Sequence, residues 1–159
     1  MLGKNFINSN WRGRFFRYAP LILWIGVIFF MSSGQASMSE TSRFIRPFLE
    51  WLFPNSTPET LTIYHGYIRK FAHFFEYAVL AFWSWLAFRY SSIVVLRKYW
   101  FVWSFIFIAL TASMDEYNQS LNAARTGSIY DVLLDISGGL FSIIILLIFT
   151  KEDKRQVIE

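Results

Sequence analysis

Long apolar runs separated by short basic segments constrain the fold of this chain more than any other feature. An α-helix rises 1.5 Å per residue, so about 20 consecutive apolar residues cross the hydrocarbon core of a bilayer. The four runs that approach this length cover about residues 18–33, 71–88, 100–114 and 129–149. The sequence therefore predicts four transmembrane helices.

Composition favours a single membrane domain over a soluble one. Of the 159 residues, 55% are hydrophobic and only 16% are charged, against roughly 25% charged in an average soluble domain. A chain of this length is expected to form one domain, here residues 1–159. It contains no cysteine, which excludes disulfides, thiolate zinc sites and cysteine nucleophiles. The predicted fold class is an all-α membrane protein built as a bundle of four transmembrane helices.

The segment between the first two spans has a different pattern. Over residues 39–53, one helix face carries apolar side chains such as Phe44, Phe48 and Leu52, whereas Arg43, Arg46 and Glu50 lie on another. Such a helix lies in the membrane interface instead of crossing the bilayer. Farther along, Thr57-Pro58 is typical of an N-cap followed by proline in the first helical turn.

The distribution of Lys and Arg predicts the orientation of the chain. Ten of these residues lie before the first span, between spans two and three, or after the fourth span; five lie in the other two loops. Under the positive-inside rule, both termini are expected in the cytoplasm. The net charge of +4 is explained by these flanking bases, so no nucleic-acid partner is predicted.

In this topology, polar residues at the ends of the second, third and fourth spans lie at the same membrane face. Lys70, His73 and Tyr77 share a helix face, since they are spaced by three and four residues. Asp115 and Glu116 follow the third span, with Gln119 within helical reach. Arg125 lies in the last loop, and Asp131 and Asp135 are one turn apart in the fourth span. Lys70, His73, Glu116, Arg125, Asp131 and Asp135 are predicted to converge in one pocket.

These residue types suggest acid–base chemistry on an anionic substrate. His73, Asp115, Glu116, Asp131 and Asp135 are the candidate catalytic residues, because carboxylates and imidazole transfer protons near neutral pH. The candidate substrate-binding residues are Lys70, Tyr77, Gln119 and Arg125, of which the bases suit a phosphate or carboxylate. No ligand spacing such as HExxH is present, so no metal site is assigned, and any cofactor remains unknown.

Each of these residues also has a structural interpretation. Asp131 follows Ser128 at capping-box spacing, Lys70 can extend to the interface, and Asp115 and Glu116 can be solvated loop residues. Gly138 and Gly139 are expected to let another helix approach closely. Asp135 is the hardest to explain structurally, since an unpaired carboxylate at membrane depth is costly.

The same residues carry a resemblance to a known family. The chain carries Lys70-x-x-His73-Phe-x-x-Tyr77, Asp115-Glu116-x-x-Gln119, Arg125, and Asp131 with a glycine farther along the fourth span. These motifs resemble the VanZ-like family, named for a teicoplanin resistance protein. The resemblance covers about residues 18–149. One departure is Asp135, where the family more usually carries asparagine. The resemblance implies a small multi-pass protein of the bacterial cytoplasmic membrane, with membrane lipid and a lipid-linked envelope substrate or lipoglycopeptide as partners.

Two functions are compatible with these observations. The first is an enzyme acting at the outer leaflet on a lipid or lipid-linked cell-envelope substrate, linked to teicoplanin resistance. The alternative is a non-enzymatic protein that binds and shields an acylated antibiotic or envelope lipid. An enzyme should convert its ligand, whereas a binding protein should not.

Overall fold

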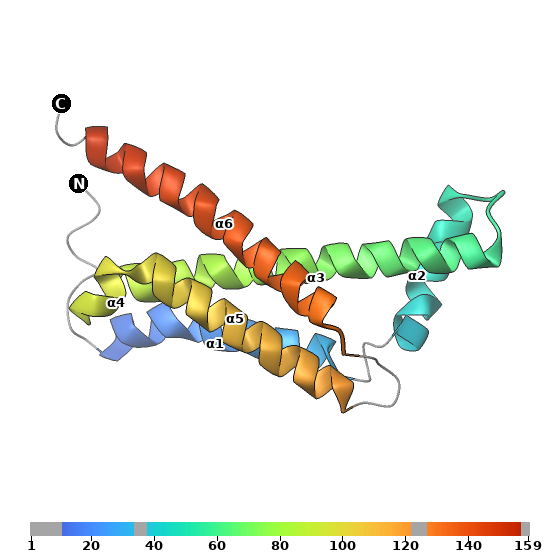
Figure 1. Ribbon diagram of the computed structural model, residues 1–159, viewed down its shortest axis with the longest axis horizontal. Helices are drawn as coiled ribbons and strands as arrows, with labels where there is room; N and C mark the ends of the chain where they lie inside the picture. The colour runs from blue at the N-terminus through green and yellow to red at the C-terminus, as the bar shows by residue number, and fades with distance from the viewer. Residues whose placement is uncertain (1–10, 34–37, 122–126, 157–159) are drawn as a thin grey trace.

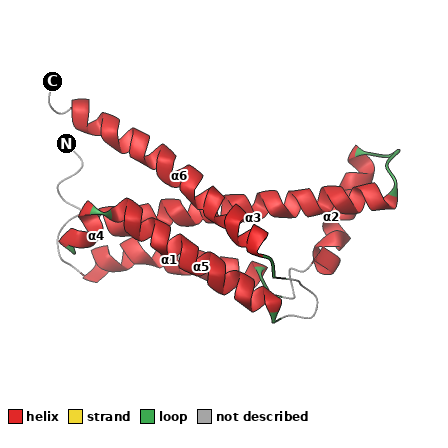
Figure 2. Ribbon diagram, in the orientation of Figure 1, coloured by secondary structure: helices red, strands yellow, loops and turns green. Residues whose placement is uncertain are grey.

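The computed structural model describes residues 11–33, 38–121 and 127–156, which form helices and short connections without a strand (Figures 1 and 2). The all-α prediction is confirmed. In chain order the helices are α1 (Trp11–Met31), α2 (Met38–Leu52), α3 (Pro58–Arg89), α4 (Val94–Lys98), α5 (Trp100–Ser120) and α6 (Ile129–Gln156).

The long helices α1, α3, α5 and α6 alternate in direction, and α3 runs through the middle of the molecule (Figure 1). This helix contacts each of the other described helices. The first turn of α1, the short helix α4 and the last turn of α6 all lie at one end of the bundle. Between the helices lies a core that includes Tyr77, Leu80, Ile108 and Ile143.

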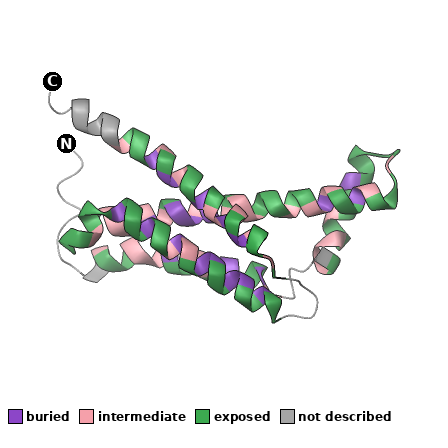
Figure 3. Ribbon diagram, viewed as in Figure 1, coloured by how far each residue is buried: buried purple, intermediate pink, exposed green. Residues whose placement is uncertain are grey.

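Three described helices are long and apolar enough to cross a membrane: Gly13–Met31, Pro58–Arg89 and Ile129–Thr150. Helix α5 is not among them, although its 21 residues correspond to about 32 Å, close to the thickness of a hydrocarbon core. Asp115 and Glu116 in its last turns lower its mean hydropathy. Many large apolar side chains of the bundle are exposed, as expected of helices surrounded by lipid (Figure 3).

Helix α2 packs along the N-terminal part of α3, the part that extends away from the other long helices (Figure 1). The predicted cap of α3 is present, because Thr57 Oγ1 accepts a hydrogen bond from the Thr60 amide and Pro58 occupies the first turn. His65 connects the two helices, with its ring nitrogens 3.1 Å from Thr41 Oγ1 and 3.3 Å from Ser42 Oγ. The sequence held no signal for this role of His65.

Helix α5 extends beyond the span predicted for it. The sequence predicted a membrane span over about residues 100–114 followed by a polar segment from Asp115 to Ser128, and the helix itself continues through Ser120. Asp115, Glu116 and Gln119 are buried residues of this helix, not loop residues. Hydropathy alone misses this extension, since an acidic turn that faces the protein interior has the same composition as a solvated loop.

Two glycines of α6 bring three helices into close packing, as their sequence suggested. A Cβ atom on Gly138 would overlap the backbone carbonyl of Phe74 in α3. A Cβ atom on Gly139 would lie 2.8 Å from Ile108 Cγ2 in α5. At Gly138 only glycine permits the two backbones to approach this closely, and at Gly139 the missing side chain leaves room for Ile108. These two positions therefore set the spacing of α6 against both neighbours.

Candidate functional site

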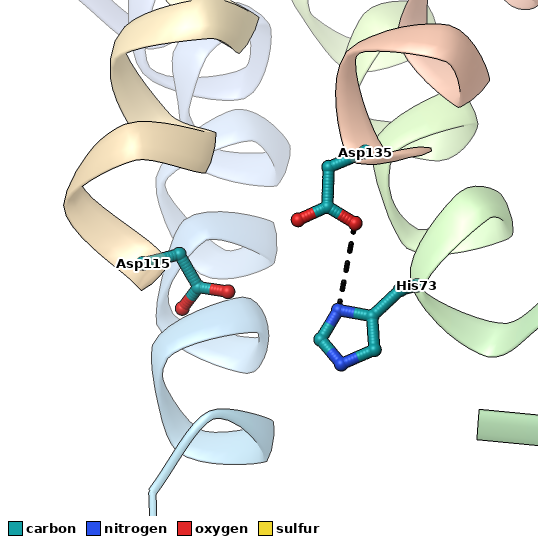
Figure 4. A group of neighbouring side chains, drawn as sticks. All are labelled: His73, Asp115 and Asp135. Atoms are coloured by element: carbon teal, nitrogen blue, oxygen red, sulfur yellow. Dashed lines mark ion pairs between the residues drawn. The ribbon is translucent and has the colours of Figure 1, made fainter. Parts of the chain in front are cut away.

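His73 of α3, Asp115 of α5 and Asp135 of α6 meet between the three helices (Figure 4). We refer to these three residues as the acid–histidine cluster. A ring nitrogen of His73 and one carboxylate oxygen from each aspartate all lie within 4.8 Å of one another. Both aspartates are 0% exposed, and His73 is partly buried. Residues up to 62 positions apart in the chain thus form one largely buried polar group.

Asp135 has an unusual environment for a buried carboxylate. Its Oδ1 lies 3.6 Å from His73 Nδ1, which is within ion-pair range. Neither of its oxygens has a hydrogen-bond partner among the described residues. Buried carboxylates are costly unless they are paired, hydrogen-bonded or bound to a metal ion, so this position is a strong candidate for function.

Asp115 is held in place by Gln119, one turn farther along α5. The Gln119 Nε2 amide donates to Asp115 Oδ2 at 3.0 Å and also to Ser32 Oγ at 3.2 Å. Gln119, predicted to bind substrate, therefore orients a carboxylate in this structure. Ser32 ends α1, so the hydrogen bond also brings that helix to the site.

The two aspartates strongly affect each other. One oxygen of each carboxylate lies within 4.8 Å of the other. Two full negative charges about 4–5 Å apart would repel by roughly 3–4 kcal/mol at an effective dielectric constant of about 20. Glu76 is a third acid near His73, with its Oε2 3.9 Å from His73 Nδ1. A cation or proton held in the cluster would offset this repulsion, and His73 offers one position for a proton.

Glu116 has a positioning role at the boundary of the cluster. Its Oε2 accepts a hydrogen bond of 2.7 Å from the Ser128 amide. Ser128 Oγ in turn accepts from the Tyr130 amide at 3.2 Å, which caps the start of α6. Glu116 thereby links the end of α5 to the first turn of α6, which carries Asp131.

Lys70 and Asp131 form a second, more accessible pair. Lys70 Nζ lies 3.6 Å from Asp131 Oδ1, and 59% of the Lys70 side chain is exposed. Lys70 precedes His73 by three residues, and a helix turns about 300° over that distance, so the two side chains point in neighbouring directions. Of the six residues predicted to form one pocket, His73 and Asp135 lie in the acid–histidine cluster, whereas Lys70 and Asp131 form a partly exposed ion pair beside it. Glu116 instead links α5 to α6. Arg125, the sixth member, lies outside the described residues.

Two other residues complete the polar surroundings. Tyr77, a predicted substrate-binding residue, is 0% exposed, and its hydroxyl has no hydrogen-bond partner among the described residues. Arg69 is partly buried and lies within electrostatic range of Glu76, Glu116 and Asp131. The sequence pattern indicated Arg69 only as a basic residue that flanks a span. Its position beside Lys70 at the start of that span was the available signal.

Comparison with known proteins supports the family suggested by the motifs. None of the curated proteins and none of the solved structures compared with the chain matches it. Residues 17–150 match the VanZ/LLP1 family, a region that contains every candidate site residue. Because this match covers most of the chain, the protein is a member of the VanZ/LLP1 family.

Proposed function

We propose that this protein is a membrane enzyme that acts on a lipid or lipid-linked cell-envelope substrate at the outer leaflet of the bacterial cytoplasmic membrane. Its activity would alter susceptibility to glycopeptides such as teicoplanin. The acid–histidine cluster is the observation that carries this proposal. Carboxylates and an imidazole that meet in a buried site are suited to general acid–base catalysis.

The proposed topology has four membrane-spanning helices, with α5 as the fourth. Helix α5 packs against α3 and α6, and its acids face inward instead of toward lipid. The bases Arg14, Arg17, Arg89, Arg97 and Lys98 belong to the end of the bundle that contains α4 and the last turn of α6. The positive-inside rule would place this end, with both termini, in the cytoplasm and the acid–histidine cluster toward the outside.

Helix α2 is proposed to lie in the outer interface, where it would guide lipid substrates toward the site. Leu49 is buried, whereas Phe44 is 82% exposed and Trp51 is also exposed. An aromatic surface of this kind suits the boundary between headgroups and acyl chains. Helix α3 is about 48 Å long at 1.5 Å per residue, so its first turns would extend beyond the hydrocarbon core and hold α2 at that boundary.

Cysteine labelling tests the orientation. The natural chain has no cysteine, so the single variants Ser56→Cys and Ser92→Cys each carry one reactive thiol. We expect a membrane-impermeant maleimide to label Ser56→Cys in intact cells and Ser92→Cys only after the cells are opened. The reverse pattern would invert the proposed orientation and place the cluster on the cytoplasmic side.

Single-turnover product analysis tests the proposed activity. Purified protein in excess is incubated with an envelope lipid extract, and the products are identified by mass spectrometry. We expect one lipid or lipid-linked species to be consumed and a product to form in proportion to the amount of protein. Retention of an unchanged lipid would instead identify a binding protein, and no conversion of any species would refute the enzyme.

A further inference from the structure

We propose that His73, Asp115 and Asp135 form a binding site for a divalent transition-metal cation, with Zn²⁺ as the cation to test first. This goes beyond the proposed function, because a metal ion can be bound here whether or not a substrate is converted. The two aspartates supply oxygen ligands and His73 supplies a nitrogen ligand.

The distance between His73 and Asp135 fits a shared metal ion better than a direct hydrogen bond. A charge-assisted N–H···O hydrogen bond is about 2.7–2.9 Å long, whereas His73 Nδ1 and Asp135 Oδ1 are 3.6 Å apart. Zinc–nitrogen and zinc–oxygen bonds are each about 2.1 Å long. If a zinc ion bound both atoms with bonds of this length, their separation of 3.6 Å would give an N–Zn–O angle of about 118°, close to the tetrahedral value.

The burial of Asp135 is an independent reason to expect a cation. This side chain is 0% exposed, its oxygens accept no hydrogen bond from the described residues, and its carboxylate points toward His73 and Asp115 (Figure 4). A buried carboxylate in this condition is the kind that coordinates metal ions. A metal ion would also reduce the repulsion between the two aspartates.

Neighbouring residues hold the three proposed ligands in position, as residues that hydrogen-bond to metal ligands do in known metal sites. The Gln119 amide donates to Asp115 Oδ2 and so fixes the orientation of this carboxylate. Outer hydrogen bonds of this kind commonly orient metal ligands. Backbone packing at Gly138, one turn after Asp135, sets the distance between α6 and the segment of α3 that carries His73.

The donor set indicates the class of metal. One imidazole and two carboxylates suit Zn²⁺ or Mn²⁺, whereas an all-oxygen set would suit Mg²⁺ or Ca²⁺. Three protein ligands leave a coordination position open, as in catalytic and unlike structural zinc sites. A water molecule or a substrate oxygen could occupy that position.

Metal analysis of tag-free protein in detergent tests this proposal. The protein is stripped with EDTA, dialysed against Zn²⁺ and analysed by elemental mass spectrometry. We expect about one zinc per chain in the wild type, and at least tenfold weaker binding after His73→Ala or Asp135→Asn. A wild-type protein that holds fewer than one zinc ion for every few chains would overturn the proposal.

The two histidines of the chain provide a matched control. His65 and His73 are the only imidazoles, and no thiolate is present. With Cu²⁺ as a probe, electron paramagnetic resonance should show coupling to nitrogen in the wild type and in His65→Ala, but not in His73→Ala. Coupling that persists without His73, or that is lost without His65, would contradict the assignment.

The metal measurement is independent of the proposed activity. Binding is measured without substrate, so a missing metal leaves the product analysis to decide whether the protein is an enzyme. A wild-type chain that binds zinc but converts nothing would support the metal site and refute the enzyme. If His73→Ala fails to fold, as judged by gel filtration, the zinc content of the wild type and the Asp135→Asn variant still decide the outcome.

Discussion

Replacing Asp115 with asparagine is expected to reduce substrate conversion by at least about 100-fold while the protein still inserts and folds. The loss follows because an amide can neither transfer a proton nor bind a metal ion as a carboxylate does, and positioned acid–base groups contribute roughly 10²–10⁴-fold to rate. The fold should persist, since asparagine has the same shape and its amide oxygen can still accept from Gln119. The thermal stability of the metal-free protein should be unchanged or higher, because one of two repelling buried carboxylates is removed.

The measurement compares single-turnover conversion with the unfolding temperature in detergent. Glu50→Gln is the matched control, since it is also an acid-to-amide change but affects an exposed pair with Arg46 on α2. We expect the control to retain wild-type conversion. A loss of stability in Asp115→Asn that accounts for its loss of conversion would show that the aspartate has a structural role only.

Gly138→Ala is expected to be the most disruptive single substitution in the bundle. The added methyl group would overlap the carbonyl of Phe74, a backbone group that cannot rotate away. Overpacking typically costs about 1–3 kcal/mol, and the cost should reach at least the upper end of this range where backbone must move. Phe74 is the residue directly after His73, and Gly138 lies one helical turn after Asp135. Separation of α3 and α6 should therefore also disrupt the acid–histidine cluster.

Gly66→Ala is the control for this substitution. Gly66 lies in α3, and apart from its chain neighbours and the adjacent backbone of its own helix, a Cβ atom there would meet no atom within 4 Å. Alanine favours a helix over glycine by up to about 1 kcal/mol, so this variant should be as stable as the wild type or more stable. Thermal unfolding in detergent measures both variants. Equal unfolding temperatures for Gly138→Ala and the wild type would refute the close packing.

Much of the fold could be predicted from the sequence, because long apolar runs leave few alternatives to membrane helices. The helical class, the cap at Thr57 and the packing role of Gly138 were available from local patterns. The extension of α5 was not, since Asp115 and Glu116 end an apolar run in the way that a loop does. Whether an acid faces the interior or solvent depends on neighbouring helices, which the local pattern does not contain.

The candidate site was predicted as a group of residues, and its internal pairing required the structure. The spacing of Lys70, His73 and Tyr77 indicated one side of a helix, but it did not separate the exposed Lys70 from the partly buried His73. Contacts between distant segments were also inaccessible. Gln119 meets Ser32 from 87 positions away in the chain, and His65 meets Thr41 only because α2 docks against α3.

The measurement that tests the central claim most directly is a double-mutant comparison of His73→Ala, Asp115→Asn and the combined variant. The claim is that these residues act as one catalytic unit in the acid–histidine cluster. Residues that work as a unit have strongly non-additive effects on rate. We therefore predict that the double variant converts substrate no more slowly than the slower single variant. Losses that multiply, or single variants that retain wild-type conversion, would contradict the account.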